Sequence, residues 1–171
     1  AGKSWYRHRP MAEETFPMTP AGLERLRVEL KRIKEVERPD NVREIETARE
    51  HGDLRENAEY HAAKERQGNL EGRLRYLEYR IAHAEVIDPA TMKTDRIAFG
   101  ATVTVLDVDT DDEIVYAIVG EDEADADQGR LSIFSPIVRA LIGKVEGDAV
   151  TLHLPKGARE LEVVRVEYKA L

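Results

Sequence analysis

The sequence predicts an α+β protein in which an N-terminal antiparallel α-helical coiled-coil hairpin precedes a small, mostly antiparallel β-sheet domain with one short helix. Apolar residues recur at helical spacing as far as residue 87, and from residue 97 the period becomes that of strands. Gly52 interrupts the helical part near its midpoint. These observations divide the chain into an extension (1–17), a hairpin (18–87), a linker (88–96) and a sheet domain (97–171).

The N-terminal extension shows little periodicity. Met11 is a candidate natural start, so part of the segment before it could be a tag. Trp5 and Tyr6 are expected to lie in an untethered tail, since termini are often poorly ordered. Residues 1–17 are therefore left out of the fold prediction.

The composition indicates a folded chain with one domain or two small ones. Apolar residues make up 42% of the 171, enough to bury a core. Cysteine is absent, and no apolar run reaches the roughly 18 residues that a membrane span needs. We expect a cytoplasmic monomer that does not contact a membrane. The net charge of -8 argues against nonspecific binding of duplex nucleic acid, which requires clustered Lys and Arg.

The first arm of the hairpin is expected to start at Thr19 as the N-cap, with Pro20 in the first helical position. One helical face then carries Leu23, Leu26, Leu30 and Ile33. Proline lacks the N–H that a regular helix needs, so Pro39 predicts a kink or short break. Beyond it the pattern resumes, shifted by two positions, at Val42, Ile45 and Ala48.

The second arm has a strict 3-4 spacing that is typical of a coiled coil. The positions are Tyr60, Ala63, Gln67, Leu70, Leu74, Leu77, Ile81 and Ala84. When the apolar positions of both arms face each other, as in Leu30 with Leu77, the pairs share a midpoint between Asp53 and Leu54. The acidic tip is therefore GDLREN, residues 52–57, with Gly52 ending one helix and Asp53 capping the next. Arms of this length predict a rod of roughly 45 to 50 Å.

The sheet domain contains five segments with strand character. They are IAFGATVTVL, IVYAIVG, LSIF, DAVTLHL and ARELEVVRVEY. One short helix is predicted in SPIVRALIGK, with Ser135 as N-cap, Pro136 at the first position and Gly143 as the stop. The acidic segments DVDTDDE and EDEADADQGR are expected to be solvated turns.

The chemistry that the tip suggests depends on Asp53 and Glu56. Three residues apart at a helix start, they lie on one side and could share a divalent cation. They could equally cap the helix and complement its dipole, and spacing alone favours this second reading. Mg²⁺ usually takes one or two protein carboxylates, so the pair would suit a site completed by another molecule.

Other candidate chemistry in the sequence is limited. Basic residues near the tip could follow a phosphate backbone or form i,i+4 pairs with nearby Glu residues: Arg49, Arg55, Lys64 and Arg66. The acidic loop at 107–113 lacks the glycine and the terminal Glu of a calcium loop. There is no phosphate-binding loop, nucleophile elbow or zinc pattern, so no autonomous active site is expected.

The tip segment GDLRENAEYHAAKERQG resembles the tip motif of the bacterial transcript-cleavage factors, the Gre family, and most closely its A-type member. Further segments resemble the family's successive blocks over residues 17–169. They are PMTPAGLERLRVEL, ETAREHGD, FGATVTVLDVD, VGEDEAD, SPIVRALIGK and VVRVEYK.

This resemblance implies a transcription elongation factor whose FKBP-like domain, residues 97–171, docks on RNA polymerase at the rim of its secondary channel. The coiled coil would carry Asp53 and Glu56 to the polymerase's catalytic centre. There they would help to hold the second Mg²⁺ and orient the attacking water during cleavage of backtracked RNA. The chain would bind no cofactor alone and would not itself be an enzyme, because it stimulates the polymerase's own RNA hydrolysis.

The resemblance also assigns supporting roles. The residues expected to contact the nascent RNA 3′ end are Arg49, Arg55 and Lys64. Those expected to support the tip are Asn57 and Tyr60, and those expected to dock on polymerase are Ile133, Ser135 and Pro136. One alternative is a secondary-channel regulator that does not cleave, and the intact GDLRENAEY argues against it. The other is an FKBP-like prolyl isomerase or chaperone, for which the pocket aromatics are few: Phe99, Tyr116 and Phe134.

Overall fold

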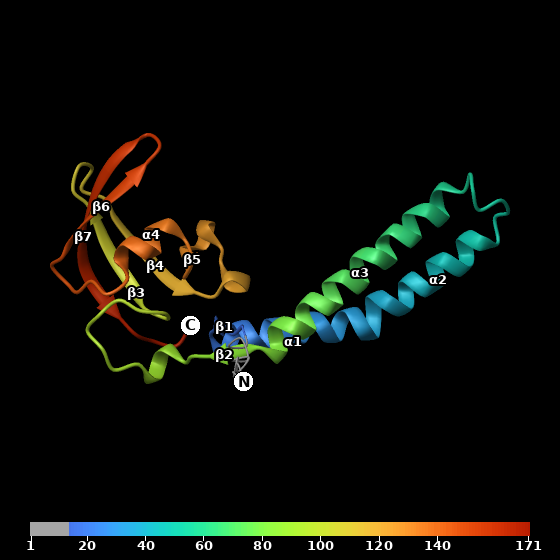
Figure 1. Ribbon diagram of the computed structural model, residues 1–171, viewed down its shortest axis with the longest axis horizontal. Coiled ribbons are helices and arrows are strands. Elements are labelled where there is room, and N and C mark those ends of the chain that lie inside the picture. Colours follow the sequence, from blue (N-terminus) through green and yellow to red (C-terminus); the bar gives the residue numbers. More distant parts are fainter. Residues whose placement is uncertain (1–13) are drawn as a thin grey trace, which may run out of the picture.

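A helical rod projects from one side of a β-sheet domain in the computed structural model (Figure 1). The structure describes residues 14–171, so the expectations for Trp5, Tyr6 and Met11 lie outside the described residues. Within 14–171, no helix combines the length and the apolar character needed to cross a membrane. The predicted α+β fold is confirmed.

The first arm of the rod is one helical run of three segments, α1 (Pro20–Arg32), the π-helical η1 (Ile33–Glu37) and α2 (Arg38–Arg49). Thr19 is the N-cap, and its hydroxyl accepts a hydrogen bond from the Gly22 N–H at 3.1 Å. The predicted helix start is therefore confirmed.

The irregularity predicted at Pro39 takes the form of η1, which comes just before it. The Arg38 N–H bonds to the Ile33 carbonyl, five residues earlier. Because proline has no N–H and its ring crowds the preceding turn, a wider π-helical turn accommodates it without ending the helix.

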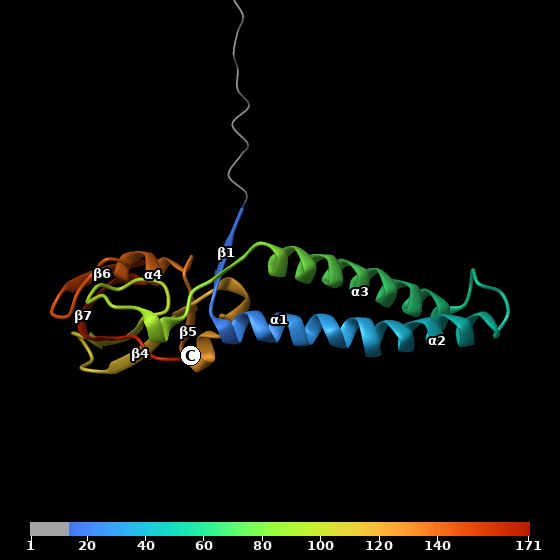
Figure 2. The same ribbon diagram turned by 90° about the horizontal axis from the view of Figure 1, so that it is seen from below.

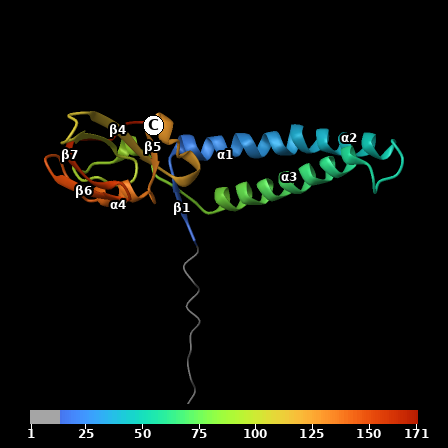
Figure 3. The ribbon, with the colours of Figure 1, turned by 90° about the horizontal axis from the view of Figure 1, so that it is seen from above.

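The second arm, α3 (Ala58–Ala82), runs beside the first along the whole rod, as Figures 2 and 3 show from opposite sides. The apolar core between the arms is formed by Leu26, Ile33, Leu74 and Leu77, with Leu23, Leu30, Leu70 and Ile81 at its margin. The predicted facing positions of the second arm are all buried or half-buried.

One predicted facing position of the first arm is wrong. Val42 is 47% exposed, whereas its neighbour Asn41 is only 2% exposed and donates from Nδ2 to the Ala63 carbonyl at 2.9 Å. The π-helical turn changes the rotation of the chain before α2, so position 41 faces the second arm in place of 42.

A small parallel sheet at the base of the rod was missed. Strand β1 (Phe16–Met18) pairs with β2 (Ala84–Val86), with Phe16 opposite Ala84. Phe16 and Met18 are buried against the rod, so residues 16 and 17 belong to the fold. Ala84 lies just past the end of α3 and continues the core as a strand. Three-residue strands are too short to show a period in the sequence.

The second domain is a five-stranded sheet of order β5-β4-β3-β7-β6 in which only the β4–β5 pair is parallel. Its strands are β3 (Thr102–Asp107), β4 (Glu113–Val119), β5 (Arg130–Ser132), β6 (Ala149–Leu154) and β7 (Gly157–Glu167). Helix α4 (Pro136–Leu141) has Ser135 as its N-cap and buries Val138 and Leu141 in the core. Residues 97–101, expected to begin the first strand, precede β3 as a turn.

Short helical turns connect these elements. They are η2 (Pro89–Thr91), η3 (Glu121–Glu123) and η4 (Ala126–Gln128). The expectation of a solvated turn is wrong for η3, because Glu123 is only 6% exposed and bonds to the start of α1. The acidic segment is therefore part of the joint between the two domains.

Candidate functional site at the tip of the rod

The tip is the turn between α2 and α3, at the end of the rod that lies farthest from the sheet domain (Figure 1). It includes the predicted segment 52–57. Gly52 has φ 105°, a conformation that favours glycine, and no atom surrounds the place where a Cβ would be. The need for glycine here is conformational.

Asp53 and Glu56 are both exposed on this turn. The Asp53 Oδ1 accepts a hydrogen bond from the Arg55 N–H at 2.9 Å, so this carboxylate stabilises the turn. The expectation that Asp53 caps the returning helix is wrong. The N-cap is Asn57, whose Oδ1 accepts from the Tyr60 N–H at 3.0 Å, because the turn continues for four residues beyond Asp53 before α3 begins.

Asn57 also connects the two arms. Its Nδ2 donates to the Ala48 carbonyl at 2.6 Å, close to the end of α2. On α3, the Tyr60 ring lies 6.0 Å from the Arg49 guanidinium carbon and packs edge-on against His61. These contacts hold the start of one helix against the end of the other.

The two acidic side chains border a shallow, open depression together with His51 and Glu59. The His51 Nε2 lies 3.6 Å from Glu59 Oε2. Glu59 was not singled out from the sequence, although its position three residues after Glu56 at a helix start was a signal for it. Within residues 14–171 no three His, Cys, Asp or Glu side chains are placed to hold a metal ion. The depression thus offers an incomplete set of ligands.

The predicted basic residues differ in the contacts that they make. Lys64 donates to the Gln67 side chain at 2.8 Å, and Arg49 lies over Tyr60. Arg66 forms an ion pair with Glu44 on the other arm, not the i,i+4 pair within its own helix that the alternative predicted. Arg55 is exposed on the turn, between the two acidic residues in sequence. Among these four, Arg55 therefore lies closest in the chain to the acidic pair.

The three residues expected to dock on a partner lie together before α4 and at its first position. Ile133 is half-buried, and its N–H donates to the Val119 carbonyl at 2.9 Å. Ser135 caps α4, and Pro136 is exposed. Phe134, between them in sequence, presents an exposed ring that was not predicted as part of this surface.

Two family models together match most of the chain. The family described as "Transcription elongation factor, N-terminal" matches residues 16–86, which contain the rod. The family described as "Transcription elongation factor, GreA/GreB, C-term" matches residues 92–168, which contain the sheet domain.

Individual relatives match over the same extent. The transcription elongation factor GreA of Francisella tularensis subsp. novicida (strain U112) is 52% identical over 160 residues, covering 93% of this chain and 100% of the relative. GreA of F. tularensis subsp. tularensis (strain WY96-3418) matches with the same values. Among solved structures, the crystal structure of GreA factor homolog 1 of Thermus thermophilus is 27% identical and covers 90% of this chain and 99% of that chain, with a TM-score of 0.42.

Proposed function

The chain belongs to the GreA/GreB family of transcription elongation factors, and from this premise we propose that it stimulates cleavage of the RNA 3′ end in backtracked RNA polymerase complexes. The sheet domain docks at the rim of the polymerase's secondary channel. The rod enters the channel and brings the acidic tip to the catalytic centre, where the polymerase's own hydrolytic activity cuts the RNA.

The observation that carries this proposal is the state of the acidic pair. The Asp53 Oδ2 and both Glu56 oxygens accept no hydrogen bond from any residue in 14–171. A carboxylate that served only as a helix cap would be engaged by backbone N–H groups. Exposed and largely unengaged at the end of a long rod, the pair is available to a ligand that another molecule holds.

The donor set of the tip fits Mg²⁺ as part of a shared site, because this ion usually takes one or two protein carboxylates together with water and phosphate oxygens. Bound there, the ion would stabilise charge on the attacking and leaving oxygens of an in-line displacement. Asp53 and Glu56 supply carboxylate oxygens and accept a hydrogen bond from the attacking water. Asn57 holds the turn that carries them.

Basic side chains around the tip are proposed to contact the RNA 3′ end through its phosphates. Arg55 belongs to the tip turn itself, while Arg49 and Lys64 lie on the two arms behind it. On the sheet domain, the surface of Ile133, Ser135 and Pro136 is proposed to contact the polymerase.

The experiment is RNA release from stalled, backtracked elongation complexes at saturating factor. We expect Asp53→Ala with Glu56→Ala to slow cleavage by about 100-fold or more, the scale for losing groups that stabilise transition-state charge. The matched control is Glu24→Ala with Glu65→Ala, which removes two exposed carboxylates of the rod outside the tip depression. It should cleave as fast as the unmodified chain.

Two outcomes would contradict the proposal. If the tip variant cleaves as well as the control, the acidic pair has no part in the reaction. If the unmodified chain binds polymerase but releases no RNA at adequate Mg²⁺, the chain is a regulator that does not cleave.

A further inference from the structure

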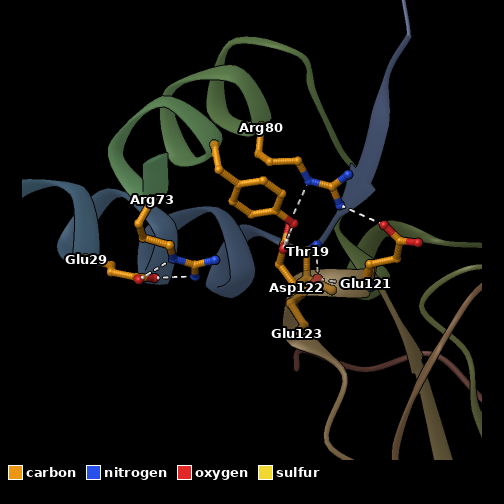
Figure 4. A network of polar contacts seen from close by, with 9 residues as sticks. Thr19, Glu29, Arg73, Arg80, Glu121, Asp122 and Glu123 are labelled. Atoms are coloured by element: carbon orange, nitrogen blue, oxygen red, sulfur yellow. Dashed lines mark hydrogen bonds and ion pairs between the residues drawn. The ribbon is translucent and has the colours of Figure 1, made fainter. Parts of the chain in front are cut away.

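The base of the rod meets the sheet domain through the turn η3, whose three acidic residues each contact the rod (Figure 4). Glu121 and Asp122 reach Arg80 on α3, and Glu123 reaches Thr19 at the start of α1. Both arms of the rod are therefore fixed to one short turn.

Glu123 is the most deeply engaged of the three. Its Oε2 accepts hydrogen bonds from the Thr19 N–H at 3.0 Å and from the Gly120 N–H at 3.2 Å, and its Oε1 accepts one from the Thr19 hydroxyl. That hydroxyl in turn accepts from the Gly22 N–H. The carboxylate thus lies at the positive end of α1, where the helix dipole favours negative charge, and these bonds to an anion are of the strong type.

Two glycines of the joint, Gly22 and Gly120, have no room for a side chain. A Cβ at Gly22 would overlap the Glu123 carboxylate group, and one at Gly120 would overlap the Pro17 carbonyl. Neither glycine has a positive φ, so close approach is what requires them. The two domains touch at these points without intervening atoms.

Arg80 holds the other arm. It is only 6% exposed, with Nε 2.8 Å from Asp122 Oδ2 and Nη2 3.3 Å from Glu121 Oε2. Its guanidinium carbon lies 3.7 Å from the centre of the Phe16 ring, a distance typical of a cation–π contact. A planar, partly desolvated guanidinium held in this way has little freedom to turn.

Because the rod is long, its direction at this joint determines where its tip lies. With 25 residues, α3 is roughly 38 Å long, so a rotation of about 10° at its base would move its far end by about 7 Å. A misplacement of about 1 Å at a reacting centre can reduce a rate by as much as 100-fold. A small rotation at η3 would therefore displace the tip by a distance large enough to affect the reaction.

We propose that Glu123 is a positioning residue for transcript cleavage, because its bonds to Thr19 fix the direction of the rod relative to the docking domain and so the place that Asp53 and Glu56 reach. The inference rests on the function proposed above. Glu123, although buried and far from the tip, thus affects the rate of cleavage but not the affinity for polymerase.

The direction of the rod can be measured without polymerase. The chain has no cysteine, so a variant with Glu46→Cys on α2 and Thr151→Cys on β6 carries spin labels at these two exposed sites and nowhere else. The distribution of distances between the two labels reports the angle between rod and sheet. We expect Glu123→Ala to shift or broaden this distribution. The control Glu29→Ala, which breaks the Arg73 pair inside the rod, should leave it unchanged.

Cleavage by the unlabelled variants gives the second readout. Glu123→Ala should lower the maximal cleavage rate by about tenfold or more, with less than a twofold change in the half-saturating factor concentration. Thr19→Ser keeps the hydroxyl that bonds Glu123 and should retain both the distance and the rate.

A second variant covers the case in which Glu123→Ala does not fold. Gly22→Ala keeps every charged group but pushes against the Glu123 carboxylate, so it should shift the distance and slow cleavage on its own. Added to Glu123→Ala, where that carboxylate is gone, Gly22→Ala should have a smaller effect.

An unchanged distance distribution in folded Glu123→Ala, or a shifted one with an undiminished maximal rate, would overturn the inference. A loss confined to the half-saturating concentration would also overturn it, because it would indicate a docking role. If the unmodified chain cleaved no RNA, the proposed function would fail, and the distances would still decide whether Glu123 fixes the rod.

Discussion

Single side chains organise both ends of the molecule. At the tip, Asn57 uses its carbonyl oxygen to cap α3 and its amide nitrogen to hold the end of α2. In the sheet domain, Asp107 is only 1% exposed and accepts bonds from the Asp109 and Thr110 N–H groups and from the Arg159 guanidinium. In each case one polar side chain closes a turn, and its removal is expected to loosen that turn.

Asn57→Ala should destabilise the protein by about 1 kcal/mol, the usual cost of losing an N-cap, and should also slow cleavage because the tip turn loses its clamp. Asn57→Asp keeps the capping oxygen but loses the bond to the Ala48 carbonyl, so it should recover most of the stability and less of the cleavage. Urea unfolding and RNA release measure the two effects. Asn69→Ala, at an exposed position inside α3, is the control. Equal cleavage rates for Asn57→Ala and the control would show that the hydrogen bonds of Asn57 are not needed for cleavage.

The Asp107 carboxyl makes the stability of the fold dependent on pH in the acid range. The hydrogen bonds from Arg159 lower the pKa of the Asp107 carboxyl from its ordinary value of 3.8, against the opposing effect of burial. Because the folded pKa is below the unfolded one, this stabilisation is complete above about pH 3.8 and is lost as pH falls through the folded value.

Asp107→Asn should therefore lower the urea midpoint at pH 7, and the gap to the unmodified protein should narrow as the pH is taken below 3.8. Unfolding curves across that range measure the gap. Asp109→Asn, an exposed change in the same turn, should show a small gap at every pH. A gap for Asp107→Asn that stays constant into strong acid would contradict the linkage.

At the scale of elements, the rod joins a regular arm to an irregular one. The strictly spaced α3 packs against an arm whose π-helical segment η1 changes the facing position to Asn41. A buried Asn in a coiled-coil seam specifies register and costs stability. The hydrogen bond from the Asn41 side-chain amide to the Ala63 carbonyl is a contact of that kind in the part of the rod nearer the tip.

Asn41→Leu should stabilise the protein by about 1 kcal/mol, since an apolar side chain replaces a buried polar one in the seam. Thermal unfolding checks this, with Val42→Leu as the control at the adjacent exposed position. A lower midpoint for Asn41→Leu than for the control would mean that the hydrogen bond from the Asn41 amide stabilises the protein more than apolar packing does.

At the scale of the whole molecule, the joint at η3 holds together two domains that the chain connects through the segment between β2 and the sheet-domain core, which begins at Ile97. Arg80 is central to it, since it contacts Asp122, Glu121 and the Phe16 ring. The remaining ion pairs of the rod, such as Arg73 with Glu29, are exposed and lie within the rod. Coupling between the domains is thus concentrated in a few partly buried groups.

Arg80→Met should lower the free energy of unfolding by about 1 to 3 kcal/mol, less than for a fully buried pair because Glu121 is half-exposed. It should also separate the unfolding of rod and sheet into two calorimetric transitions. Arg73→Met, which breaks an exposed pair, should cost about 1 kcal/mol or less and keep a single transition. Identical thermograms for the two variants would refute the coupling.

The hairpin, most of its facing positions and the place of the acidic tip could be predicted from the amino-acid sequence alone. Helical periodicity, a proline and a glycine act over a few neighbouring residues, so these features can be read along the chain. The five strands and α4 followed from the same local signals. The resemblance of the tip motif then indicated the family, which the two family models bear out.

Which polar side chains form hydrogen bonds, and with which partners, became clear from the tertiary structure alone. That Asn57 caps α3 in place of Asp53, and that Asn41 faces the partner arm in place of Val42, depends on how the turn and η1 rotate the chain. The burial of Glu123 depends on Thr19, 104 residues away. A periodic pattern reports only on residues a few positions apart, whereas the bond between Glu123 and Thr19 depends on how the rod and the sheet domain pack against each other.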